Sequence, residues 1–166
     1  MDKTKLVRND NGFNQFKDHL TSLQSKYDVE LVQLFELLSE KEIFVPLSVF
    51  SKKISTLETI SKYLHENLNL SFKKIGELMN RSEKTIWQAY KFSKIKHPEK
   101  LKSADTKYII PVSVFANRKL SNLEAIVYYI KNTYYLKFSQ IGPLLKRDQR
   151  TIWTVYSRAK KKYLKE

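Results

Sequence analysis

Two segments of this chain, LSFKKIGELMNRSEKTIWQAY (residues 70–90) and LKFSQIGPLLKRDQRTIWTVY (residues 136–156), align with each other without a gap. Both place Gly after Ile, an Arg before a helix-capping residue, then Thr-Ile-Trp and a final Tyr. Upstream, FVPLSVF (44–50) aligns with IIPVSVF (109–115), and KISTLETISKYL (53–64) with KLSNLEAIVYYI (119–130). So many rare residues in one register indicate a duplicated module.

Each copy predicts three helices. The first follows a capping box, Ser55 with Glu58 or Ser121 with Glu124. The second is expected at residues 71–79 and 138–145, and the third after the N-caps Ser82 and Asp148, extending to about residues 93 and 161. Because so short a turn makes the last two helices cross steeply, the pattern predicts an all-α fold with two tandem three-helix helix-turn-helix units.

The predicted boundaries are a helical N-terminal extension at residues 1–42, a first unit at 43–96, a Lys-rich linker at 97–108 and a second unit at 109–166. In the extension, apolar residues at helical spacing predict one helix around residues 13–23 and another around 29–38. This extension is interpreted either as a cap on the neighbouring unit or as a homo-oligomerisation element at residues 12–40. The sequence leaves open whether residues 44–50 and 109–115 are short strands or extended arms.

The charge is strongly basic and unevenly distributed. The chain has 31 Lys and Arg against 17 Asp and Glu, a net charge of +14, which favours polyanionic partners. Residues 1–42 hold six cations and eight anions, so the excess lies in residues 43–166. With no Cys, no apolar leader and no long apolar run, the chain is expected to be cytoplasmic and nucleoid-associated, without a membrane partner.

Helical phase separates a buried face from a polar face in the third helix. If Ile86 is buried, Tyr90 and Ser93 share its face, as do Ile152, Tyr156 and Ala159 in the second copy. The opposite face then carries Lys84, Gln88 and Lys91, or Arg150, Thr154, Ser157 and Arg158. Gly76 and Gly142 are expected to allow close packing of this helix. Trp87 and Trp153 are expected at the edge of the core, with stacking on a sugar or base as the alternative interpretation.

These motifs resemble region 4 of bacterial sigma factors and the related DNA-binding domains of the LuxR class, over about residues 53–96 and 119–164. The resemblance implies a third helix in the major groove and a second helix that begins against phosphate. Two departures are notable: the family's turn glycine is Asn80 or Lys146 here, and Pro143 is expected to kink or shorten the second helix of copy two. No polymerase-binding or promoter-melting region is evident, so a working sigma factor is not expected.

Helical phase and the resemblance together select two sets of candidate site residues. Those expected to contact bases, or to lie beside such contacts, are Lys84, Thr85, Gln88, Lys91, Arg150, Thr151, Thr154 and Ser157. Those expected to contact phosphate are Ser71, Lys73, Lys74, Arg81, Lys94, Ser139, Arg147, Arg158, Lys160 and Lys161.

The predicted function is double-stranded DNA binding by two linked units that contact dissimilar half-sites, as a transcriptional regulator. The alternatives are a chromosome-organising protein that bridges duplexes, and a protein-interaction adaptor of a polymerase or replication complex. Enzymatic activity is not expected, because the three His residues are scattered and no phosphate loop or paired carboxylates occur. No cofactor, metal or small-molecule substrate is predicted.

Overall fold

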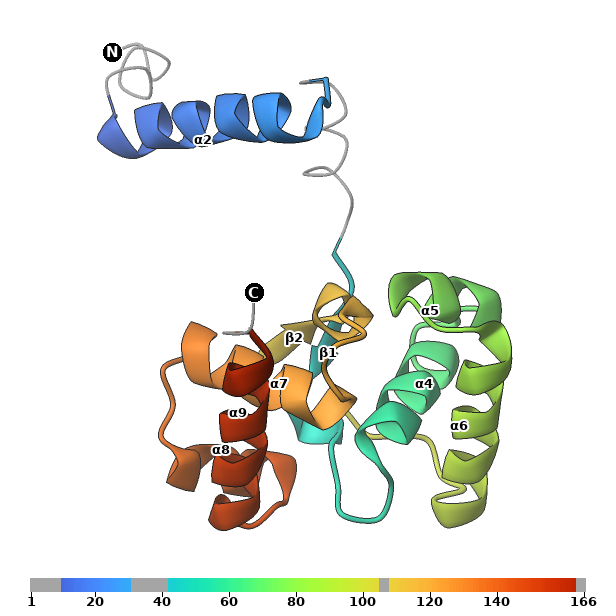
Figure 1. Ribbon diagram of the computed structural model, residues 1–166. Coiled ribbons are helices and arrows are strands. Elements are labelled where there is room, and N and C mark those ends of the chain that lie inside the picture. The colour runs from blue at the N-terminus through green and yellow to red at the C-terminus, as the bar shows by residue number, and fades with distance from the viewer. Residues whose placement is uncertain (1–9, 31–41, 105–107, 164–166) are drawn as a thin grey trace, which may run out of the picture. The chain divides into compact units, whose positions relative to one another are not determined.

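A computed structural model describes residues 10–30, 42–104 and 108–163 (Figure 1). The described residues are mostly α-helical, with one small two-stranded sheet, so the predicted all-α fold class is confirmed. Residues 1–41 and 42–166 form two separate compact units.

In the first unit, helix α2 spans Asn11–Tyr27. Asp10 caps it by accepting a hydrogen bond from the backbone N–H of Phe13 at 2.9 Å, and Asp28 ends it in a left-handed conformation. The predicted first helix of the extension is therefore present, although Phe13 and Phe16 keep 39% and 45% of their surface exposed. The predicted second helix lies outside the described residues, apart from its first positions.

Each sequence repeat in the second unit contains three helices. They are α4 (Thr56–Glu66), α5 (Phe72–Leu78) and α6 (Glu83–Lys96) in the first repeat, and α7 (Asn122–Thr133), α8 (Phe138–Leu145) and α9 (Gln149–Tyr163) in the second. Both predicted capping boxes are present, at the starts of α4 and α7. Pro143 lies inside α8 and does not shorten it: α8 has eight residues, whereas the equivalent helix α5, which has no Pro, has seven.

The segments before these helices are short strands followed by 3₁₀ turns, which resolves the choice between strands and arms. Strand β1 (Phe44–Pro46) precedes η1 (Leu47–Val49), and β2 (Ile109–Pro111) precedes η2 (Val112–Ala116). The strands pair antiparallel with Val45 opposite Ile110, and these two residues occupy equivalent positions of the repeat. The bonds Leu47 N–H to Tyr108 C=O (3.0 Å) and Val112 N–H to Ile43 C=O (2.8 Å) are also equivalent. The repeats are thus related by a pseudo-twofold axis between Val45 and Ile110.

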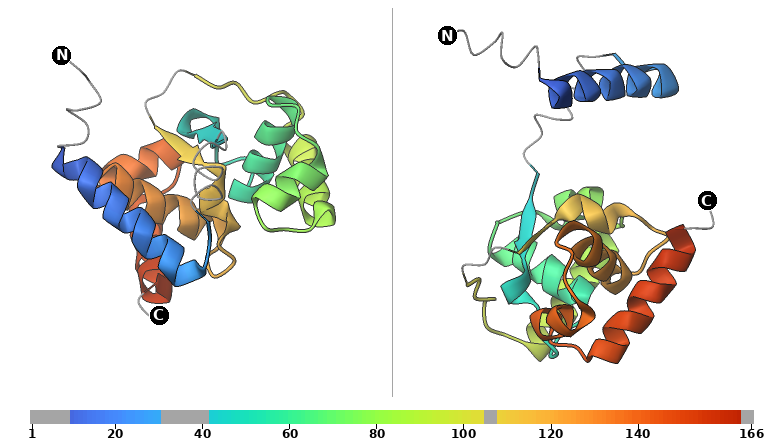
Figure 2. Two further views of the ribbon diagram at one scale, coloured as in Figure 1. Left: turned by 90° about the horizontal axis from the view of Figure 1, so that it is seen from above. Right: turned by 90° about the vertical axis from the view of Figure 1, so that its left-hand side faces the viewer.

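The contacts between the two repeats follow the same pseudo-twofold symmetry. Figures 1 and 2 show the two three-helix groups on either side of the strand pair. The turn η1 packs on α8 and η2 packs on α5, so each 3₁₀ turn contacts a helix of the opposite repeat. Residues of both repeats join one hydrophobic core, and Leu101 of the predicted linker is 5% exposed within it. The two repeats and the segment between them therefore form a single compact unit.

Candidate nucleic-acid interface

Helix α6 presents the polar face that its sequence predicts. Its N-cap Ser82 accepts a hydrogen bond from the N–H of Thr85 at 3.2 Å. Ile86, Ala89 and Ser93 are buried against α4 and α5, while Tyr90 is half-buried. This fixes the rotation of the helix, and the side chains exposed on its outer face include Lys84, Gln88 and Lys91. Thr85 is half-buried, with its hydroxyl 2.8 Å from that of Ser82.

Helix α9 presents the equivalent face in the second repeat. The Asp148 carboxylate accepts a hydrogen bond from the N–H of Arg150 at 2.8 Å, and Ile152, Val155 and Ala159 are buried. Arg150 and Thr151 are exposed, as expected. Thr154 and Ser157 are half-buried and so are less exposed than the sequence predicts. The Thr154 hydroxyl donates a hydrogen bond to the backbone carbonyl of Arg150 at 2.9 Å. Arg150 is therefore an exposed cationic side chain near the start of this helix.

The turn before each of these helices is tight for a specific reason. Asn80 and Lys146 both adopt the left-handed conformation, with φ of 50° and 53°. A Cβ added to Gly76 would lie 2.6 Å from the carbonyl oxygen of Arg81, and one added to Gly142 would lie 2.8 Å from that of Arg147. The predicted role of the two glycines in close packing is confirmed. The turn itself, rather than a distant side chain, fills the space.

Several candidate phosphate-contacting residues are exposed along one repeat or the other. Ser71 is the N-cap of α5 and accepts a hydrogen bond from the N–H of Lys74 at 3.2 Å. Its equivalent position in the second repeat is Lys137, so Ser139 is not a cap but an exposed residue in the first turn of α8. The remaining exposed candidates are Lys73, Lys74, Arg158, Lys160 and Lys161, together with Lys94, which forms contacts within the protein.

Three candidates are committed to contacts within the protein or are partly covered. The Arg81 guanidinium donates to the Asn122 side chain of α7 at 3.0 Å, which links the two repeats. Arg147 is half-buried at the equivalent position. The Lys94 ammonium lies 3.3 Å from the Glu66 carboxylate and donates to the Pro98 carbonyl at 3.0 Å. The charge of Lys94 is therefore partly neutralised.

An ion-pair network holds α6 on α4. Lys62 is fully buried and lies 2.9 Å from Glu66, which also accepts a hydrogen bond from the Tyr90 hydroxyl at 3.2 Å. Burial alone raises the pKa of Glu66, but the bonds and charges of Lys62 and Lys94 outweigh it, so the pKa lies below its ordinary value. Burial raises the pKa of Tyr90, and the adjacent Glu66 carboxylate raises it further. The network keeps Glu66 ionised and α6 in place.

The prediction for the two tryptophans was wrong. Trp87 and Trp153 retain 45% and 58% of their surface exposed, and the Lys91 ammonium lies 5.2 Å from the centre of the Trp87 ring. Trp87 lies on the same α6 face as Lys84 and Lys91, which are three and four residues away from it. The sequence places Trp87 about 100° around the helix from the buried Ile86. It does not show on which side of Ile86 the other helices pack, and this side decides whether Trp87 is exposed.

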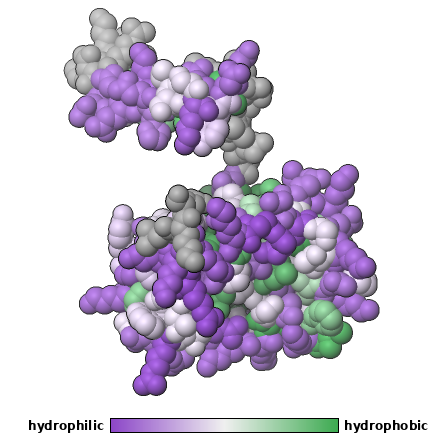
Figure 3. All heavy atoms as spheres, in the orientation of Figure 1, coloured by the Kyte–Doolittle hydropathy of each residue, from purple (hydrophilic) through white to green (hydrophobic). Residues whose placement is uncertain are grey.

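The surface of the compact unit is mostly hydrophilic on the face shown in Figure 3, with an apolar patch on the side where α6 lies. Helix α6 contributes Phe92 and Ile95 to the exposed apolar residues, at 54% and 69% exposure. Among the described residues, no three His, Cys, Asp or Glu side chains are grouped as a metal site would require. None of the described helices combines the length and apolar character needed to cross a bilayer.

Comparisons with protein-family models, with curated protein sequences and with solved structures found no match to this chain.

Proposed function

We propose that the chain binds double-stranded DNA as a transcriptional regulator in the nucleoid, with α6 and α9 as the recognition helices of two helix-turn-helix units. The observation that carries this proposal is the exposure of long polar side chains near the start of both helices. Lys84 and Gln88 on α6, and Arg150 on α9, lie in the N-terminal half of their helices and are exposed. In helix-turn-helix proteins this part of the recognition helix contacts base edges.

The distribution of charge supports a polyanionic partner. The excess of cations lies in residues 43–166, which hold both repeats, and Arg158, Lys160 and Lys161 are exposed along α9. Arg and Lys can pair with guanine and Gln with adenine in the major groove, so the exposed side chains have suitable chemistry.

The pseudo-twofold axis predicts how the two half-sites are oriented relative to each other on the DNA. Two units related by a twofold axis present their recognition helices in opposite directions, as dimers on palindromic operators do. The contacting residues differ, Lys84 with Gln88 against Arg150 with Thr154. The proposed target is therefore a pair of inverted but dissimilar half-sites. Selection from a random duplex library would test this, and direct repeats among the selected sequences would contradict it.

The decisive variant removes one exposed cation from each recognition helix. Lys84→Ala with Arg150→Ala is expected to weaken binding to a selected duplex, since each good base contact contributes about 1 to 3 kcal/mol. Fluorescence anisotropy at several salt concentrations measures it. A matched control, Lys17→Ala with Lys102→Ala, removes two exposed cations from elsewhere in the chain. Equal affinity of the test and control variants would contradict the proposed interface.

The other candidate functions predict different results in the same assays. A duplex-bridging protein would bind random and selected DNA equally, and an adaptor would retain its protein partner after nuclease treatment. Homo-oligomerisation through residues 12–40 stays a prediction, and sedimentation of the chain with and without residues 1–41 would measure it.

A further inference from the structure

Two open grooves in the compact unit are related by the pseudo-twofold axis. Groove A, of about 730 Å³, combines the α8–α9 turn of the second repeat with residues 51–53, which follow η1 of the first. Groove B, of about 590 Å³, combines the α5–α6 turn of the first repeat with Arg118, which follows η2 of the second. Lys52 and Arg118 are equivalent in the two repeats. Each groove is thus built from a turn of one repeat and a basic loop of the other.

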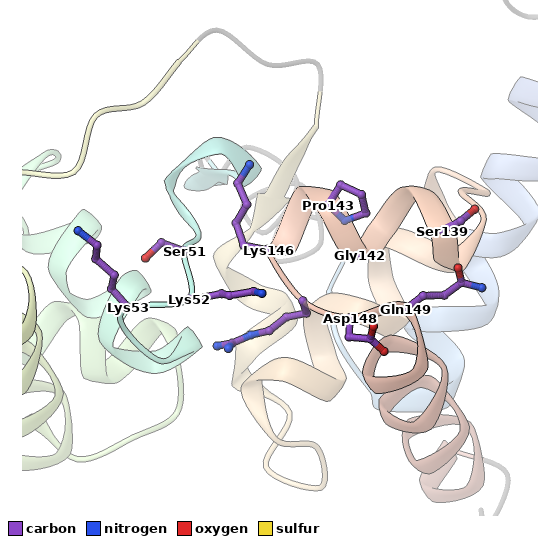
Figure 4. Close-up of a pocket in the computed structure, with 10 residues that line it drawn as sticks. Ser51, Lys52, Lys53, Ser139, Gly142, Pro143, Lys146, Asp148 and Gln149 are labelled. Carbon is purple, nitrogen blue, oxygen red and sulfur yellow. The ribbon is translucent and has the colours of Figure 1, made fainter.

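In groove A several cations come together around open space. Lys52, Lys53, Lys146 and Arg147 line it, with Asp148 as the one acidic lining residue. Figure 4 shows Lys52 extending from the first repeat toward the turn that carries Lys146, whereas Lys53 points the other way. Within the described part of the chain, none of these four cations forms an ion pair. An anion in the groove would relieve their mutual repulsion.

Groove B shows the same arrangement with a weaker excess of charge. Lys73, Arg81 and Arg118 line it together with Glu77 and Glu83. Burial lowers the pKa of Arg81, and the nearby charge of Arg118 lowers it further, so the two guanidinium groups repel each other. The Nε atom of Arg81 is buried and has no hydrogen-bond partner among the described residues. A phosphate oxygen in the groove would accept from Arg118 and from the guanidinium nitrogens of Arg81 other than the buried Nε.

We infer that each groove binds a backbone phosphate of the duplex and that each is completed by the opposite repeat, with Lys52 serving the α8–α9 unit and Arg118 the α5–α6 unit. This inference rests on the proposed DNA-binding function and adds residues outside the two helix-turn-helix motifs. Groove A is the stronger site: even without Lys53, which points away, it has three cations and one acid, whereas groove B has three cations and two acids.

The salt dependence of DNA binding tests whether these residues contact phosphate. Lys52→Ala and Arg118→Ala should each weaken duplex binding and lower the slope of log affinity against log salt by about 0.9, the value for one lost phosphate contact. Lys102→Ala, which removes an exposed Lys outside both grooves, should leave the slope unchanged. Because Lys52 and Arg118 are exposed, circular dichroism should show that the variants fold normally.

A double-mutant cycle tests whether the groove is shared between repeats. If Lys52 and Lys146 hold the same phosphate, the double variant should lose less affinity than the product of the two single losses. Lys52 with Lys73 provides the control, because these residues line different grooves and their losses should multiply. Multiplying losses for Lys52 with Lys146 would overturn the shared site.

The two proposals fail in distinguishable ways. A wild-type chain that does not bind duplex DNA would overturn the proposed function and this inference together. A wild-type chain that binds, with Lys52→Ala and Arg118→Ala indistinguishable from Lys102→Ala, would overturn the inference alone.

Discussion

Gly76 and Gly142 set the distance between the last two helices of each repeat. The carbonyl oxygens of Arg81 and Arg147 occupy the places where their side chains would be, at 2.6 and 2.8 Å from an added Cβ. Because backbone rather than a flexible side chain fills the space, a methyl group can be accommodated only if the turn moves.

We therefore expect Gly76→Ala to destabilise residues 42–166 by about 1 to 3 kcal/mol, although Ala favours helices over Gly. Gly12→Ala is the control, because its added Cβ would meet only the end of the Asp10 side chain. Urea unfolding followed by Trp fluorescence measures the stability of residues 42–166 in both variants, because both tryptophans lie in that unit. A Gly76→Ala variant as stable as the wild type would show that the turn between α5 and α6 shifts without cost, which would contradict this prediction.

At the scale of elements, the contact of α4 with α6 depends on the ionised state of Glu66. Its pKa lies below the ordinary value of 4.5, so the carboxylate stabilises the fold above that pH, and this stability is lost as the pH falls through the folded pKa. The pKa of Glu124, which pairs with Lys162 at 2.6 Å, is lowered as well: burial raises it, but the Lys162 and Ser121 bonds prevail.

Glu66→Gln should lower the melting temperature at neutral pH, because it leaves the charge of buried Lys62 without its counter-ion. The loss should be about 3 kcal/mol, at the lower end for a broken buried pair, since the amide can still accept a hydrogen bond. The variant should also lose less further stability than the wild type below pH 4.5. Thermal melts across pH measure both effects, with the exposed Glu99→Gln as control. Parallel pH curves for Glu66→Gln and wild type would exclude this role.

Local signals in the sequence predicted most of the elements. The Ser-x-x-Glu capping boxes and the Ser82 N-cap each involve residues within four positions of one another, so they can be recognised from the sequence alone. Contacts between the repeats were not predicted, because the pairing of Val45 with Ile110 and the Arg81–Asn122 bond join residues far apart in the chain. The groove position of Lys52 depends on the packing between the repeats, and the exposure of Trp87 depends on how α6 packs on α4 and α5, so neither could be derived from spacing.

At the scale of the whole molecule, residues 42–166 share one core, so both repeats should unfold together. Ile110 is fully buried beside the axis, and Ile110→Ala should destabilise the unit by about 2 to 5 kcal/mol. The neighbouring Ile109, which is 37% exposed, provides the control Ile109→Ala.

The two tryptophans allow each repeat to be followed separately. With Trp153→Phe the fluorescence reports on the first repeat, and with Trp87→Phe on the second. We expect Ile110→Ala to shift the urea midpoint seen by each probe equally, because a cooperative unit has a single transition. Separate midpoints for the two probes would mean that the repeats unfold independently.

The pairing of Val45 with its counterpart Ile110 gives one polypeptide the internal geometry of a symmetric homodimer. Covalent joining frees such halves from having to remain identical. Where the first half has Lys62 and Glu66, the second has Tyr128 and Asn132, with Tyr156 donating to Asn132 as Tyr90 donates to Glu66. Each repeat of such a protein can therefore change its residues independently of the other, and the twofold arrangement forms within a single chain.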